Sequence, residues 1–405
     1  MSVPADITAP PRGGHALPAH IVGASAGGSP AARSRRRPRR GIVLGVAGAV
    51  VIAGALGAVQ VTANLGYDDA ASGFDDAYES TQSSFSALDG ATAQLAETTE
   101  VANQLVAADA GTLTDPTAKE TLNAAVAAAG ETQSTAHGLL AAELPDAGEK
   151  PAFFWDLFGA TEQLHAQTAH LEGLAEDADA ESPAVGDADA AIDGAGMAYL
   201  GTAATAASAF EAAHLSARND DVIALREAAG TLSLSTTLDT TSIDSFLALQ
   251  DAANQVVASE QAELAEKGGP LLNARLEVEA FARSLAPGVL LEFDWNPIVN
   301  NAGFNGSMGG LTTWWWDEPD RAVIELSNSV AEQWPAERSR ALVAHEVGHA
   351  ISVKCEDMYD SSTQDSIEKW ATAWAISMGF TDDANGVWAY GYPPQSYIDA
   401  AYGCR

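Results

Sequence analysis

The amino-acid sequence predicts a mainly α protein, in which an extended helical bundle or stalk precedes a small α+β domain at the C-terminus. Between residue 68 and about residue 269 the chain is rich in Ala, Glu, Asp, Gln, Thr and Leu, and apolar residues recur at helical spacing. After residue 270 the composition shifts to short strand-like runs, a Gly/Asn-rich loop and two further helical patterns. A chain of 405 residues has room for two or three such units.

The N-terminal segment has two parts. Residues 1–40 contain seven arginines and one acid and have no hydrophobic period, which predicts a disordered, basic cytoplasmic tail. Residues 41–66 contain no charged residue and are nearly all apolar over residues 42–63, and about 20 apolar residues can cross a bilayer. With arginines before this run and Asp68 after it, we expect a transmembrane signal anchor in a single-pass membrane protein whose remainder is extracytoplasmic. A cleaved signal peptide is the alternative, although forty residues make a long leader.

Residues 67–269 predict an extracytoplasmic stalk of four to six helices. No clean repeat and no sustained heptad is apparent, so the sequence leaves the packing of these helices open. The stalk is the region expected to bind a partner or a second copy of the chain. The net charge of −35 would repel nucleic acid, so no nucleic-acid partner is expected. Helix breaks are expected at Pro116, Pro145, Pro151, Pro183 and Gly268-Gly269-Pro270.

Residues 270–405 predict alternating helices and strands. Three tryptophans, residues 314–316, could line an apolar cleft, although alternation in a strand would place Trp315 opposite the other two. The expected helices cover residues 271–285, 337–353 and about 365–378, and the expected strands cover residues 289–293 and 321–327.

The most informative motif is His-Glu-Val-Gly-His over residues 345–349, within the predicted helix 337–353. Two histidines four residues apart project from the same helix face, so the imidazoles of His345 and His349 can reach one metal ion. Glu346 lies beside them as a base for a metal-activated water. Zn²⁺ suits this site because it accepts neutral imidazole, prefers four ligands and has no redox chemistry.

The third ligand has to come from outside this helix. Its downstream candidates include Asp365 and Glu368, and we favour Glu368, which adjoins the apolar stripe of the next helix. Small residues on its own face, such as Thr372, would let the two helices approach closely. The alternative is an ordinary solvent-facing glutamate near a helix N-terminus. Three protein ligands and an open position are typical of catalytic zinc.

Taken together, the motif and the helix containing Glu368 resemble the gluzincin zinc metallopeptidases, over roughly residues 289–405. The resemblance implies a zincin-like catalytic domain over residues 270–405, with zinc bound by His345, His349 and Glu368 and with Glu346 as general base. The glutamate helix of that family often carries an acid four residues after the ligand, where this chain has Thr372. A metzincin would need a third histidine shortly after the second, and none follows His349.

Hydrolysis of peptide bonds in a peptide or protein substrate is the activity that this resemblance implies. The strand before the metal helix, residues 321–327, would be the substrate-binding edge. The oxyanion needs a second donor, and Tyr390, Tyr392 and Tyr397 are candidates. We favour Tyr392, because the turn that follows Gly391 could hold it at the cleft, while buried packing is the alternative for each tyrosine.

Two other interpretations of the chain remain open. One is a non-enzymatic surface protein whose helical region binds a partner and whose metal site is structural. The other is a zinc hydrolase that acts on cell-wall material. The two cysteines, Cys355 and Cys404, are expected to form a disulfide if the domain is exported, and two unpaired buried thiols are the alternative.

Overall fold

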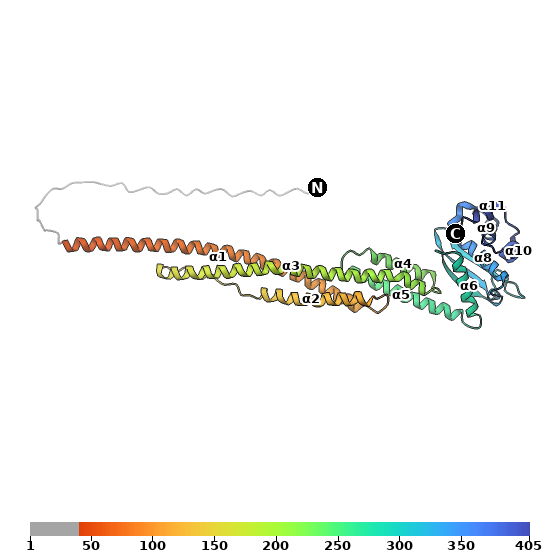
Figure 1. Cartoon of the computed structure of the whole chain (residues 1–405), viewed down its shortest axis with the longest axis horizontal. Helices are drawn as coiled ribbons and strands as arrows, with labels where there is room; N and C mark the ends of the chain where they lie inside the picture. Colours follow the sequence, from red (N-terminus) through yellow and green to blue (C-terminus); the bar gives the residue numbers. More distant parts are fainter. Residues whose placement is uncertain (1–39) are drawn as a thin grey trace, which may run out of the picture.

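The computed structural model describes residues 40–405, with side chains described from residue 52 onward, so residues 1–39 of the predicted basic tail lie outside the described part. This part is mainly helical and contains one three-stranded sheet, as the sequence predicts. Long helices form a rod, and a small domain with the sheet lies at one end of it (Figure 1).

Five helices form the rod, within the predicted range of four to six. The two longest, α1 and α3, lie side by side, and α2 packs along both of them (Figure 1). The shorter α4 and α5 form the end that meets the sheet domain. The bounds are α1 (Arg40–Ala108), α2 (Pro116–Leu140), α3 (Phe154–Ala213), α4 (Asn219–Ser233) and α5 (Thr240–Glu266).

A heptad seam holds α3 in place, contrary to the sequence-based expectation of no sustained heptad. Every seventh residue of α3 is buried, from Leu157 to Tyr199. The repeat is hard to see in the sequence because alanine, threonine and polar residues fill most positions between these residues. Pro183 lies inside the continuous helix, so the break predicted there is wrong. Buried residues on both sides, Ala178 and Val185, keep the helix packed although proline removes one backbone hydrogen bond.

The predicted signal anchor and the single-pass membrane localisation are wrong. Within residues 40–405, no helix has an apolar stretch of the length and hydropathy needed to span a bilayer. Residues 41–66 instead form the first turns of α1, and their last part already packs within the stalk. The Gln60 side chain donates to the Ala152 carbonyl oxygen (3.2 Å) and accepts from the Phe154 backbone N–H (2.9 Å). Ala63 is buried in the cluster that contains Leu157.

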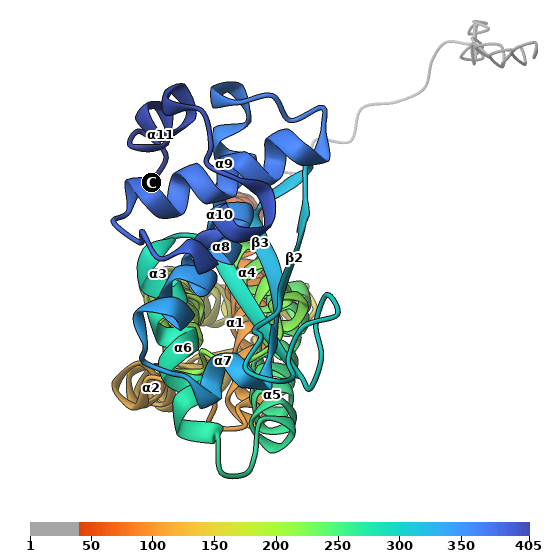
Figure 2. The same cartoon turned by 90° about the vertical axis from the view of Figure 1, so that its right-hand side faces the viewer.

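The C-terminal domain is built on a sheet with strand order β1-β3-β2. The central strand, β3, is parallel to β1 and antiparallel to β2. Helices α8 and α9 cross next to this sheet, as the view along the rod shows (Figure 2). The bounds are α6 (Leu272–Leu285), β1 (Leu290–Asn296), β2 (Gly310–Trp315), β3 (Glu318–Ser327), α7 (Asn328–Glu332), α8 (Glu337–Ser352), α9 (Gln364–Ser377), α10 (Val387–Tyr390) and α11 (Gln395–Ala401), with 3₁₀ helices at Val353–Met358 and Asp383–Asn385.

The strand predicted as a substrate-binding edge, residues 321–327, is the middle strand of the sheet, so that prediction is wrong. Both sides of β3 are paired, because a tight hairpin brings β2 onto one side and the longer connection from β1 supplies the other. The strand β2, which contacts α8, has one side that pairs with no other strand of the sheet. Three tryptophans lie at its end, with Trp314 and Trp316 in contact at a ring distance of 6.4 Å and Trp315 against Arg321 instead.

Close packing of α8 and α9 explains the glycine within the motif. A Cβ atom on Gly348 would lie only 2.8 Å from the Ala371 carbonyl oxygen, so only glycine permits this helix approach. Trp370 and Trp374 of α9 are fully buried in the domain core beside Val347. The two helices that carry the candidate ligands are therefore fixed relative to each other by the core.

A buried polar interface joins the stalk to the sheet domain. At the start of α4, the backbone N–H of Asn219 donates to Glu292 Oε2 (2.7 Å), and its side-chain amide donates to the Ala322 carbonyl oxygen (2.9 Å). Lys267, at the end of α5, is buried between the carboxylates of Glu263 and Glu279. Separating the stalk from the domain would leave these buried groups without their partners, so the contacts couple the two parts.

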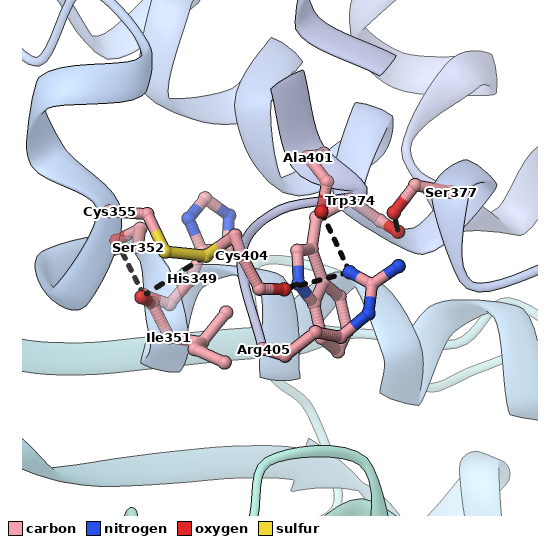
Figure 3. Close-up of a disulfide and its surroundings, with 9 residues drawn as sticks. All are labelled: His349, Ile351, Ser352, Cys355, Trp374, Ser377, Ala401, Cys404 and Arg405. Carbon is pink, nitrogen blue, oxygen red and sulfur yellow. Dashed lines mark hydrogen bonds between the residues drawn. A yellow bond between two sulfur atoms is a disulfide. The ribbon is translucent and has the colours of Figure 1, made fainter. Parts of the chain in front are cut away.

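A disulfide between Cys355 and Cys404 confirms the pairing favoured from the sequence (Figure 3). It ties the C-terminus to the segment directly after α8. The indole N–H of Trp374 donates to the Cys404 carbonyl oxygen (3.0 Å), and the Arg405 guanidinium donates to the carbonyl oxygens of Ala401 and Cys404 (Figure 3). The C-terminal helix is thereby held against α9.

Candidate metal centre

Three predicted ligands meet at one point. His345 and His349 project from α8, and Glu368 projects from the first turns of α9. The two imidazole Nε2 atoms lie 3.2 Å apart, and Glu368 Oε2 lies 3.2 Å from His345 Nε2 and 3.1 Å from His349 Nε2. Both histidines are buried, and the glutamate side chain is nearly so. The structure thus brings together the three residues that the sequence selects.

The spacing of these three atoms fits a tetrahedral cation. Zinc–nitrogen bonds of about 2.05 Å place neighbouring ligands of a tetrahedron about 3.3 Å apart. The observed triangle has sides of 3.1 to 3.2 Å, and its donors are two nitrogens and one oxygen. This donor set is the one that borderline metals such as zinc prefer. The residues therefore fit a zinc ion with three protein ligands and one open position.

Thr372 determines which nitrogen of His345 is free to bind a metal at the point where the three candidate ligands meet. Its hydroxyl donates its only proton to the Glu368 carbonyl oxygen (2.9 Å), so its oxygen is left to accept. That oxygen lies 3.4 Å from His345 Nδ1, which therefore carries a proton and donates to it. With Nδ1 protonated, Nε2 can present its lone pair to a metal. Thr372 thus orients the His345 ring and selects its tautomer.

His349 is oriented by packing. Within the described part of the chain its Nδ1 atom has no hydrogen-bond partner. Its ring stacks on Trp314 of β2, with ring centres 5.2 Å apart and planes at 7°. The ring of His345 stacks in a similar way on Tyr390, at 5.8 Å and 12°. Each imidazole is therefore held by one aromatic neighbour.

The carboxylate of Glu368 is held ionised and in one orientation. Its Oε1 accepts a hydrogen bond from the side chain of Gln364 (2.8 Å), which leaves Oε2 facing the histidines. Burial alone would raise the pKa of Glu368, but hydrogen bonds with His345 and His349 outweigh it and hold the pKa well below its usual range. An ionised carboxylate with one free oxygen is the form that binds a cation.

Glu346 lies between the ligand cluster and β2. It is buried, its Oε2 accepts from the Thr312 hydroxyl (2.7 Å), and burial raises the pKa of this carboxyl group. A Cβ atom on Gly310 would lie 2.2 Å from Glu346 Oε1, so only a glycine leaves room for the carboxylate there. Sequence reasoning missed Gly310 and Thr312, because their roles depend on how β2 lies against α8.

The tyrosine at the site is Tyr390, and the sequence-based preference for Tyr392 is not supported. Tyr392 is 67% exposed and does not line the cavity, because the chain turns at Gly391, which has a φ of 79°. Tyr397 is also elsewhere and exchanges a hydrogen bond with Ser366 (2.6 Å). Burial, followed by the carboxylate of Glu368, raises the pKa of Tyr390 to about 12, so its hydroxyl stays protonated at neutral pH.

A small cavity connects these groups. Its volume is about 230 Å³, and its lining includes polar side chains and the aromatic rings of Trp314 and Tyr390. Gly386 also borders the site, and sequence reasoning did not identify it. A Cβ atom on Gly386 would clash with Thr372 and with the His345 ring. The cavity is lined by the three candidate ligands and, among others, by Asn300, Gly310, Thr312, Trp314, Glu346 and Tyr390.

No protein-family model, curated protein or solved structure matches this chain.

Proposed function

We propose that this protein is a zinc-dependent peptidase that hydrolyses peptide bonds, with His345, His349 and Glu368 as metal ligands and Glu346 as general base. The observation that carries the proposal is the triangle of donor atoms, 3.1 to 3.2 Å on each side, with a buried carboxylate next to it in the same cavity. The similarity of the motif to gluzincins supports the same function. A zinc ion bound there would polarise a carbonyl group and lower the pKa of a water molecule to about 7.

Glu346 is suited to accept the proton of that water. Its Oε2 is engaged by Thr312, which leaves Oε1 beside Gly310 as the basic atom. The pKa of this carboxyl group is raised by burial, which brings it closer to the pKa of the water that it has to deprotonate. The same carboxyl group can then donate the proton to the leaving amine.

Tyr390 is suited to stabilise the oxyanion. It lines the cavity next to His345, and its hydroxyl keeps its proton at neutral pH. A hydrogen-bond donor that is already in place when negative charge develops lowers the barrier without reorganisation. The substrate would lie along the free side of β2, whose residues Gly310, Thr312 and Trp314 line the cavity.

The test compares wild type with Glu346→Gln on peptide mixtures and on purified cell-wall fragments. Glutamine keeps the shape and the contact with Thr312 but cannot accept a proton, so zinc binding should persist while peptide hydrolysis is lost. Peptide cleavage by wild type alone supports the proposal. Equal cleavage by the variant would refute the role of Glu346, and cleavage of wall fragments alone would favour the cell-wall hydrolase. Zinc binding without any hydrolysis would favour a structural metal site.

A further inference from the structure

The free side of β2 presents backbone groups at alternate residues. The backbone N–H of Ser327 donates to the Gly309 carbonyl oxygen (2.9 Å), and these residues are opposite each other in the register of β2 and β3. In an antiparallel pair the hydrogen-bonded positions alternate, so residues 311 and 313 also face β3. The N–H and C=O groups of Gly310 and Thr312 therefore point away from β3, toward the cavity side.

One of these outward groups is already occupied by a side chain. The Asn300 amide donates to the Gly310 carbonyl oxygen at 2.8 Å. Asn300 is at the tip of a tight turn that Val299 and Ala302 close with two backbone hydrogen bonds of 2.9 Å. A primary amide N–H is chemically the same donor as a peptide N–H. Asn300 thus makes the hydrogen bond that the backbone of an added strand would make.

The cavity offers no spare partner for the charged end of a peptide. Of the side chains that the structure places around it, none is lysine or arginine, so a terminal carboxylate would find no cationic side chain. Glu368 is engaged with the histidines, and the free Oε1 atom of Glu346 is the base of the proposed reaction. A terminus in the cavity would therefore either stay unpaired, which is costly for a buried charge, or occupy a group that hydrolysis needs, so both termini are disfavoured at this site.

We infer that the site binds an internal, extended stretch of polypeptide, whose backbone N–H replaces the Asn300 amide on the Gly310 carbonyl oxygen. If the protein is a peptidase as proposed, it then cleaves bonds within a polypeptide and not at its ends. The cleavage part of this inference rests on the proposed function, whereas the binding part does not. Asn300 competes with the substrate for one acceptor, so removing its side chain strengthens binding.

The test uses the full chain carrying Glu346→Gln, so that bound peptide is not consumed. A fluorescent peptide longer than β2 is titrated by anisotropy, in one form with free ends and in another with acetylated and amidated ends. Two substitutions are then added separately to this Glu346→Gln protein: Asn300→Gly and, as a matched control, Asn301→Gly. Both asparagines are central residues of the same turn with positive φ (47° and 59°), so glycine fits either position equally. The Asn301 side chain makes no hydrogen bond within residues 40–405.

We expect the two peptide forms to bind within about threefold of each other, and Asn300→Gly to tighten both by about two- to tenfold, the worth of one hydrogen bond. Asn301→Gly should leave binding unchanged. Binding of the free-ended form alone, absence of peptide binding, or weaker binding by Asn300→Gly would each overturn the inference. Tight binding without cleavage by wild type would instead refute the proposed peptidase function and leave this inference standing.

Discussion

Replacing Thr372 by valine tests how this chain prepares an imidazole for a metal. Valine has nearly the same shape, so packing against Gly386 is preserved while the acceptor for His345 Nδ1–H is lost. Loss of a partner that orients a metal-binding imidazole typically costs 10- to 100-fold in affinity. The hydrogen bond is long, at 3.4 Å, so we expect the lower end, about tenfold or about 1.4 kcal/mol in binding free energy.

The assay is a zinc titration of the full chain against a chromophoric chelator, for wild type, Thr372→Val and Thr372→Ser. Serine keeps the hydroxyl and should bind zinc almost as tightly as wild type, whereas valine should bind about tenfold more weakly. If valine binds like wild type, the assignment of the His345 tautomer is wrong. If serine loses as much affinity as valine, then the methyl group and not the hydroxyl supports the site.

Three further predictions concern other parts of the molecule. Gly310→Ala places a Cβ against Glu346 Oε1 and should lower peptidase activity about 100-fold, with zinc affinity unchanged. Glu292→Gln should raise the melting temperature at pH 7 but not at pH 4. Burial raises the pKa of this carboxyl above its ordinary 4.5, so wild type loses stability as pH rises, and glutamine does not titrate. Replacing Cys355 and Cys404 by serine should lower the free energy of unfolding, measured by denaturant titration. The loss should be at most about 4 kcal/mol, because the disulfide closes a loop with a sequence separation of 49 residues.

Local patterns in the sequence were sufficient for α8, α9 and the ligand cluster. Helix α8 begins at the predicted Glu337, and α9 spans Gln364–Ser377 against a predicted 365–378. The spacing of His345 and His349 fixes their common face by helix geometry alone. Glu368 could be selected because a helix with a small-residue face can approach another helix closely.

Strand order and the tyrosine could not be predicted, because both depend on contacts between distant segments. The sequence marks residues 321–327 as a strand, but its central place follows from a hairpin on one side and a parallel strand on the other. Tyr390 and Tyr392 are two residues apart, and a single turn at Gly391 decides which one lines the cavity. The apolar run over residues 41–66 was misinterpreted because composition does not reveal that Gln60 and Ala63 pack against the stalk.

Zinc K-edge X-ray absorption of the full chain, loaded with one equivalent of zinc, measures directly which side chains bind the metal. We expect two imidazole nitrogens at about 2.0–2.1 Å and one carboxylate oxygen at about 2.0–2.2 Å, with a light atom in the fourth position. Glu368→Ala should lose the carboxylate signal while both imidazoles remain. A spectrum without two imidazoles, or one that Glu368→Ala leaves unchanged, would contradict zinc binding by His345, His349 and Glu368.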